Sequence, residues 1–148
     1  MNAAEIEGFF FLDTNILIYA YDKADPDKQH LATHLVRDAL QSGRGIVSTQ
    51  VVQDFLYAAR RKFRQPMSFA ECRQYLHDVL EPLCAYFPSI STYDHVLRVI
   101  EETGYTLYDS LILTAAIESG CHTLLTEDMQ HGRKVQGLTI LNPFIDLE

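Results

Sequence analysis

Short, fully apolar segments that alternate with helical patterns are the feature that most limits how this chain folds. The first segment, Phe9–Leu12, is apolar at every position, which is typical of a strand buried on both faces. Such strands belong to parallel sheets that helices cover on both sides. The helical segments between the runs are expected to supply the crossovers that parallel strands need. The pattern therefore predicts a three-layer α/β/α fold with a short parallel central sheet.

The remaining elements follow from turn residues and helical periodicity. Ser68 and Glu71 have the spacing of a capping box, which marks the start of a helix. Gly43, Gly104 and Gly120 mark expected helix ends. The expected strands are 9–12, 45–48, 123–126 and 139–141, and the expected helices are 16–21, 26–43, 49–64, 68–84, 91–104 and 109–119.

The length and composition of the chain fit one globular domain. The chain has 148 residues, of which 47% are hydrophobic and 22% are charged, and this balance excludes an intrinsically disordered protein. No internal repeat or low-complexity linker divides the sequence. We therefore expect an N-terminal tail over residues 1–8 and a single domain over residues 9–148.

The charge balance excludes one class of function. The 12 basic and 20 acidic residues give a net charge of −8, so the chain is not a polycationic binder of nucleic acids. A metal-dependent nuclease stays open, because clustered carboxylates make such a chain acidic. Three cysteines without a CxxC pair argue against a disulfide framework and favour a reducing cytoplasm. Neither a signal peptide nor a membrane span is expected from the acidic, short N-terminal segment.

Four aspartates stand near the carboxyl ends of the expected strands, which is where parallel sheets place their sites. Asp13 and Asp128 each come just after an expected strand. Asp109 stands at the start of a helix, and Asp54 lies one turn into the helix that follows the second strand. Each aspartate alone also fits a helix cap, a turn or a solvated helix face. Together at one edge they repel one another, so the arrangement favours bound cations.

The chemistry of these side chains indicates which cations. Carboxylate oxygens suit Mg²⁺ or Mn²⁺, whereas the sequence has no Cys/His cluster for zinc. A pair of such ions activates water and neutralises the leaving oxygen when a phosphodiester bond is hydrolysed. The residues alone therefore predict a metal site for phosphodiester cleavage at this edge of the sheet.

Four ordered segments resemble the PIN domain, and they are most similar to the VapC-type ribonuclease toxins of bacterial toxin–antitoxin pairs. The resemblance covers nearly the whole chain. It implies a Mg²⁺- or Mn²⁺-dependent endoribonuclease that is a homodimer and is inhibited by a VapB-type antitoxin. The segments are FLDTNIL at 11–17, STQVVQDF at 48–55, YDSLI at 108–112 and LTEDMQHG at 125–132.

The resemblance also implies roles for individual residues. Asn15 and Thr126 match polar neighbours that help to hold the acids in place. The family usually has Glu as the second acid, so the shorter Asp54 leaves open whether it binds metal directly or through water. The implied acidic quartet that binds the metal consists of Asp13, Asp54, Asp109 and Asp128.

Three other functions stay open. A PIN nuclease of RNA processing or turnover would carry the same quartet outside any toxin pair. A catalytically silent PIN-like binding module is opposed by the intact acids, although the change to Asp54 leaves it open. A phosphatase similar to haloacid dehalogenases would use Asp13 as its nucleophile, but those enzymes carry a second Asp at the position of Asn15.

Basic and aromatic side chains are the candidate RNA contacts. The basic residues fit either a phosphate-binding patch or complementation of a helix dipole, for which one or two cations suffice. The tyrosines fit either base stacking or packing in a core or interface. His30 and His34 have a metal-ligand spacing without a supporting motif, so we interpret them as a surface pair. The basic residues are Arg60, Arg61, Lys62, Arg64, Arg133 and Lys134, and the tyrosines are Tyr19, Tyr21, Tyr57, Tyr105 and Tyr108.

Overall fold

A computed structural model describes residues 1–147, and its central sheet confirms the predicted α/β fold. The strands are β1 (Phe10–Leu12), β2 (Gly45–Ser48), β3 (Cys84–Tyr86), β4 (Thr123–Leu125), β5 (Lys134–Val135) and β6 (Leu138–Leu141). In the described residues they form one six-stranded sheet with the order β3-β2-β1-β4-β6-β5. Neighbouring strands are parallel except β5 and β6, which pair antiparallel at one edge.

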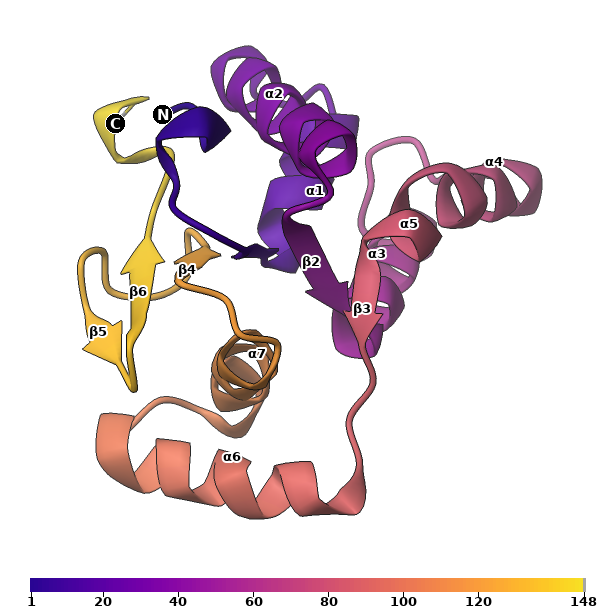
Figure 1. Cartoon of the computed structure of the whole chain (residues 1–148). Coiled ribbons are helices and arrows are strands. Elements are labelled where there is room, and N and C mark those ends of the chain that lie inside the picture. The colour runs from indigo at the N-terminus through magenta and orange to yellow at the C-terminus, as the bar shows by residue number, and fades with distance from the viewer. Residues whose placement is uncertain (148) are drawn as a thin grey trace.

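Helices cover both faces of this sheet, which confirms the three layers (Figure 1). The helices are α1 (Thr14–Tyr21), α2 (Pro26–Ser42), α3 (Thr49–Arg61), α4 (Phe69–Tyr75), α5 (Glu81–Leu83), α6 (Ile90–Thr103) and α7 (Leu107–Glu118). On one face α1 packs against α2 and α3, and on the other α7 packs against α6, β2 and β4. No helix in residues 1–147 is both long and apolar enough to span a membrane.

The apolar run of β1 lies at the centre of the core. Phe10, Phe11 and Leu12 are fully buried, as a strand covered on both faces requires. β1 and β4 pair in parallel along their whole length, so both strands reach the same edge of the sheet together. The backbone N–H of Asp13 extends this pairing by donating to the carbonyl oxygen of Leu125 at 3.0 Å. Residues that follow these two strands are therefore held side by side.

The structure differs from the sequence-based expectations between residues 68 and 86. Ser68 opens α4 with both hydrogen bonds of the predicted capping box, but the expected helix 68–84 does not continue as one α-helix. A π-helical segment, Leu76–Leu80, and α5 follow, and the edge strand β3 begins at Cys84. The long helix is interrupted because Pro82 has no N–H to donate to the helical hydrogen-bond ladder. β3 was not predicted because three half-exposed residues are too few to show an alternating pattern in the sequence. Two smaller differences are the end of α3 at Arg61 and the two-residue strand β5.

The side chain of Arg44 joins the N-terminal segment to the sheet. Its Nη1 donates to the carbonyl oxygens of Ile6 and Gly8, both at 2.8 Å, and its Nη2 donates to the carbonyl oxygen of Ala3 at 3.1 Å. Ala3 and Ile6 are buried against the core. The guanidinium also lies 5.6 Å from the centroid of the Phe10 ring. One cation therefore satisfies three carbonyls of a segment that lies outside the sheet.

Close packing of α2 on β2 depends on Gly45. A Cβ atom at this position would lie 2.2 Å from Cβ and 2.9 Å from Cα of Ala39. We expect Gly45→Ala to lower the free energy of unfolding by about 1–3 kcal/mol, because α2 must move away from the strand. Chemical denaturation measures this change. Combining it with Ala39→Gly should give a smaller loss than the sum of the single variants, and strict additivity would contradict the contact.

Candidate active site at the carboxyl ends of the strands

Asp13 is buried where β1 ends and α1 begins. Its side chain is 7% exposed, and its extended backbone makes it the N-cap of α1. Oδ1 accepts a hydrogen bond from the N–H of Thr14 at 2.7 Å, and Oδ2 accepts one from the hydroxyl of Thr126 at 2.8 Å. Asp13 therefore caps α1 and also lies at the sheet edge. Its carboxylate is held in one orientation from two sides.

Thr126 and Asn15 connect the end of β1 to the loop after β4. The Thr126 hydroxyl donates to Asp13 and accepts from the N–H of Asp128 at 3.1 Å. The amide nitrogen of Asn15 donates to Thr126 Oγ1 at 3.3 Å and to Asp128 Oδ2 at 3.1 Å. The amide oxygen of Asn15 accepts from the N–H of Glu127 at 3.3 Å. These bonds fix Asp13 and Asp128 relative to each other.

Asp109 reaches the same edge from α7. The helix begins at Leu107, two residues earlier than expected, because Thr106 is its N-cap. The Thr106 hydroxyl accepts from the N–H of Asp109 at 3.1 Å, so the carboxylate of Asp109 is not used as a cap. The side chain of Asp109 is half-buried, and that of Asp128 is exposed. We refer to Asp13, Asp109 and Asp128 as the acidic cluster.

The pKa values of Asp13 and Asp109 show the effect of neighbouring carboxylates. Burial raises the pKa of Asp13 to about 6; hydrogen bonds from Thr126 and Thr14 oppose this, and the charges of Asp128 and Asp109 add to it. Burial also raises the pKa of Asp109, and the charge of Asp128 raises it further. Three carboxyls from β1, α7 and the loop after β4 therefore lie within electrostatic reach of one another.

Asp54 lies on α3 beside a cleft. Burial raises its pKa, whereas a hydrogen bond from Gln50 and the charge of Lys62 lower it. The cleft lies between α3, α6 and α7, and Tyr93 and Tyr108 also line it. Charge effects on Asp13 and Asp109 thus connect three of the four predicted acids, and the fourth lines this cleft.

The donor atoms of the acidic cluster fit a hard divalent cation. In residues 1–147, no three His, Cys, Asp or Glu side chains are arranged closely enough to hold a metal ion by themselves. Mg²⁺ does not require three protein ligands, because it usually keeps several waters and binds one or two carboxylates together with substrate phosphates. Repulsion among the carboxylates would fall when such an ion binds. The cluster therefore fits Mg²⁺ or Mn²⁺ better than a cation that needs nitrogen or sulfur ligands.

A half-buried ion pair beside the cluster was not predicted. Lys28 Nζ lies 2.6 Å from Glu127 Oε2, and the Tyr19 hydroxyl donates to Glu127 Oε1 at 2.6 Å. Lys28 also lies over the rings of Tyr19 and Phe144. The pair fixes the loop after β4 to α1 and α2, and it neutralises a carboxylate next to Asp128. The sequence shows only that an acid, Glu127, precedes Asp128. It does not show that this acid pairs with a lysine 99 residues away.

Two of the predicted basic residues are used to hold loops. Arg60 donates to the carbonyl oxygen of Met67 at 2.6 Å, and its guanidinium lies 4.0 Å from the ring centroid of Phe69. Arg133 donates to the carbonyl oxygen of Thr103 at 3.1 Å and lies over the ring of Tyr105. The other four are exposed, and none forms an ion pair in the described part of the chain. They are Arg61, Lys62, Arg64 and Lys134.

The position of the first basic group differs from a site-adjacent patch. α3 starts at the sheet edge after Ser48, and the basic residues occupy its opposite end. A helix of 13 residues is about 20 Å long, so this group lies away from the acidic cluster. The sequence spacing did not show this, because it does not tell which end of α3 faces the cluster. His30 and His34 are exposed on α2 with ring centroids 4.7 Å apart, in agreement with a surface pair.

The five tyrosines have different environments. Tyr21 packs in an aromatic group with Phe55, and Tyr19 is bound to Glu127. The hydroxyl of Tyr105 accepts from the N–H of Gln130 at 3.0 Å. These three are structural. Tyr57 and Tyr108 are 59% and 70% exposed. Of these two, within residues 1–147, only Tyr57 has cations over its ring, those of Arg61 and Lys62.

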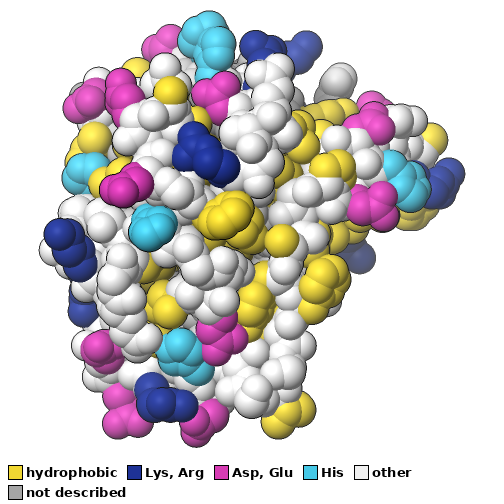
Figure 2. Space-filling model, viewed as in Figure 1, with side chains coloured by type: hydrophobic (Ala, Val, Ile, Leu, Met, Phe, Trp, Pro, Cys, Tyr) yellow, Lys and Arg dark blue, Asp and Glu magenta, His cyan; other side chains and the backbone are white. Residues whose placement is uncertain are grey.

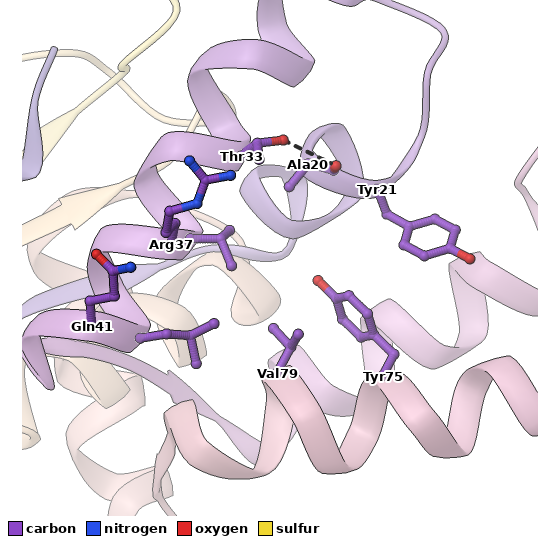
Figure 3. A pocket seen from close by; sticks show the side chains of 9 residues that line it. Ala20, Tyr21, Thr33, Arg37, Gln41, Tyr75 and Val79 are labelled. Atoms are coloured by element: carbon purple, nitrogen blue, oxygen red, sulfur yellow. Dashed lines mark hydrogen bonds between the residues drawn. The ribbon is translucent and has the colours of Figure 1, made fainter.

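A second cavity, of about 360 Å³, lies between α1, α2 and the α4–π-helical segment. Figure 3 shows Arg37 and Gln41 of α2 on one side of it and Tyr75 and Val79 on the other. Figure 2 shows hydrophobic side chains gathered in the region between α2 and α4, with charged side chains scattered around this face. None of the four predicted acids lines the cavity. It is therefore a surface feature separate from the acidic cluster.

Comparison with known proteins gives one family and several similar folds. The sequence profile described as PIN domain matches residues 10–135. No curated protein sequence matches the chain. Among solved structures, a toxin–antitoxin complex from Klebsiella pneumoniae is 17% identical with a TM-score of 0.62, covering 90% of this chain and 96% of that one.

Two further structures have a similar fold. VapBC2 from Rickettsia felis, bound to a DNA fragment from its promoter, is 18% identical with a TM-score of 0.59 and covers 89% of this chain and 96% of that one. PAE2754 from Pyrobaculum aerophilum is 20% identical with a TM-score of 0.61, with 90% of each chain covered. At these identities the comparison establishes the fold.

The buried carboxyl of Asp13 is expected to make the fold less stable as the pH rises. Its pKa of about 6 lies above the ordinary 3.8, so the folded chain keeps a proton that the unfolded chain has lost. Without divalent cations, this group should lower the free energy of unfolding by up to about 3 kcal/mol between about pH 4 and 7. Denaturation of wild type and Asp13→Asn at each pH measures the difference. Parallel profiles for the two proteins would contradict the expectation.

Proposed function

The chain belongs to the PIN domain family, and on that premise we propose that it is a Mg²⁺- or Mn²⁺-dependent endoribonuclease that hydrolyses RNA phosphodiester bonds. PIN domains are generally nucleases. The observation that carries the proposal is the acidic cluster at the carboxyl ends of β1 and β4, in which the charge of Asp128 raises the pKa of both Asp13 and Asp109. Repulsion among like charges lowers the stability of the folded chain, and a bound cation would reduce that repulsion.

Each residue of the acidic cluster would have its own role in metal binding. Asp13 and Asp109 would bind the metal, and Asp128 would support it from the other side. Bound Mg²⁺ or Mn²⁺ would polarise the scissile phosphate and supply hydroxide for in-line attack. The hydrogen bond from Thr126 keeps the Asp13 carboxylate oriented, and Asn15 does the same for Asp128.

Residues outside the cluster would bind the substrate. Asp54 would assist through water, because the charge effects on it come from Lys62 rather than from the cluster. The four exposed basic side chains would contact RNA phosphates beyond the scissile bond. Arg60 and Arg133 would add positive charge from the loops that they hold.

We further infer that the protein is the toxin of a type II toxin–antitoxin pair. One protein of similar fold is described as a toxin–antitoxin complex from Klebsiella pneumoniae, and another is VapBC2 from Rickettsia felis. The apolar cavity beside α2 would receive part of a VapB-type antitoxin, and Arg37 at its rim would pair with an acidic group (Figure 3). The protein would also form a homodimer, as the resemblance to VapC-type toxins implies.

Cleavage of RNA by the purified protein, freed of any copurifying partner, tests the proposal. We expect cleavage with Mg²⁺ or Mn²⁺ and none with EDTA. Asp13→Asn and Asp109→Asn should each lower the rate at least about 100-fold, because the metal supplies several kcal/mol to the transition state. Asp38→Asn on α2, outside the site, is the matched control and should stay fully active. Substantial cleavage by both site variants would refute the assignment, whereas metal binding without cleavage would favour a binding module.

The supporting role of Thr126 gives a separate prediction. Thr126→Val removes the hydroxyl that donates to Asp13 while keeping the side-chain shape. Loss of a hydrogen bond to a metal-binding group typically costs about 10–100-fold in metal affinity, and we expect a loss of that size for Mn²⁺. Isothermal titration calorimetry measures it. Thr126→Ser keeps the donor and should bind Mn²⁺ like the wild type; equal affinities for Val and Ser would show that the hydroxyl has no such role.

A further inference from the structure

The cleft beside Asp54 is lined by both aromatic and polar side chains. It has a volume of about 200 Å³ and lies between α3, α6 and α7. Aromatic side chains line it from α6 and α7, and amide and carboxyl side chains line it from α3. Tyr108 directly precedes Asp109, so the cleft begins next to the acidic cluster along α7. Its principal lining residues are Tyr93, Tyr108, Gln50, Gln53 and Asp54.

The two aromatic rings are available to a ligand. Tyr108 is 70% exposed and Tyr93 is 46% exposed. Within residues 1–147 neither ring stacks on another aromatic ring or lies under a cation. This differs from Tyr57, whose ring is covered by Arg61 and Lys62. Exposed tyrosine rings of this kind provide stacking surfaces for bases, because every base has a π-face.

The polar side chains of α3 give the cleft hydrogen-bonding capacity. Gln50 Nε2 donates to the carbonyl oxygen of Tyr108 at 3.4 Å, which ties the start of α3 to the start of α7. Gln53 and Asp54 are exposed on the same helix and line the same cleft. An amide offers both a donor and acceptors, and such a group reads the edge of an unstacked base.

We propose that this cleft binds one unpaired nucleobase of the RNA substrate, next to the phosphate that the acidic cluster attacks. The base stacks on Tyr108 and Tyr93, and its polar edge contacts Gln53. The inference rests on the proposed function, and it narrows the substrate to RNA with an unpaired nucleotide at the cleavage site. A base inside a duplex stays stacked and does not enter the cleft.

The lining of the cleft favours a base over a segment of a protein partner. The polar side chains on one side and the aromatic side chains on the other match the edge and the face of a base.

Binding of single-stranded RNA tests the proposal without cleavage. The parent protein is Asp13→Asn, the probe is a fluorescein-labelled RNA oligonucleotide, and fluorescence anisotropy in Mg²⁺ gives Kd. We expect Tyr108→Ala in this background to raise Kd about 5-fold to 150-fold, the range found when one stacked base loses its aromatic partner. Tyr108→Phe keeps the ring and should leave Kd unchanged. Phe9→Ala is the control, since it removes a 46% exposed aromatic ring that precedes β1, at the opposite edge of the sheet and outside the cleft.

Two further measurements identify the contact as a base. An abasic nucleotide moved along the oligonucleotide should weaken binding to the parent at one position, and Tyr108→Ala should abolish that position's effect. The salt dependence of Kd should not change in Tyr108→Ala, because stacking releases no counterions from the phosphates. A reduced salt slope would show a backbone contact and overturn the proposal.

The outcomes separate this inference from the proposed function. A parent that binds no RNA would overturn the ribonuclease proposal and the base site together. RNA binding that is equal for the parent and Tyr108→Ala would overturn the base site alone. The other possible occupant of the cleft is a second copy of the chain, and sedimentation velocity tests for it. If Tyr108→Ala both weakens RNA binding and dissociates a dimer, a second copy fills the cleft and the base site is overturned.

Discussion

The hydrogen bond from Thr126 to the buried carboxylate of Asp13 is the interaction on which the arrangement of this edge depends. It joins the residues that follow β1 and β4, the two central strands, and the same hydroxyl accepts from the backbone of Asp128. Asp13 also caps α1, so one carboxylate fixes a helix start and a strand end together. The apolar runs of β1 and β4 position this contact, because both strands are buried and paired along their length.

The acidic cluster costs the folded state stability. Burial holds the pKa of Asp13 near 6, and the charges of Asp109 and Asp128 act in the same direction. The neighbouring Glu127 does not add to the repulsion, since Lys28 and Tyr19 bind its carboxylate. The chain thus pairs Glu127 with a cation, whereas within residues 1–147 the three carboxylates of the acidic cluster form no ion pair. Unfavourable electrostatics that persist in a folded protein are typical of sites that bind or react.

The sequence predicts the parts of this structure that depend on local patterns. Apolar runs predict the four principal strands, and the strand ends then predict that Asp13 and Asp128 lie together. The π-helical segment and β3 were missed because tertiary packing, rather than a periodic pattern, determines them. The roles of Arg60 and Arg133 were also missed, since contacts with the carbonyls of Met67 and Thr103 depend on how loops fold back. The cleft beside Asp54 could not be predicted either, because it forms only where α3, α6 and α7 meet.

Anomalous diffraction from a crystal soaked in Mn²⁺ tests the central claim most directly, because it locates the ion without relying on activity. The account predicts an anomalous peak within bonding distance of the carboxylates of Asp13 and Asp109, and its loss in an Asp109→Asn crystal soaked in the same way. A fully occupied Mn²⁺ at another place, such as His30 and His34, with no peak at the acidic cluster would contradict it.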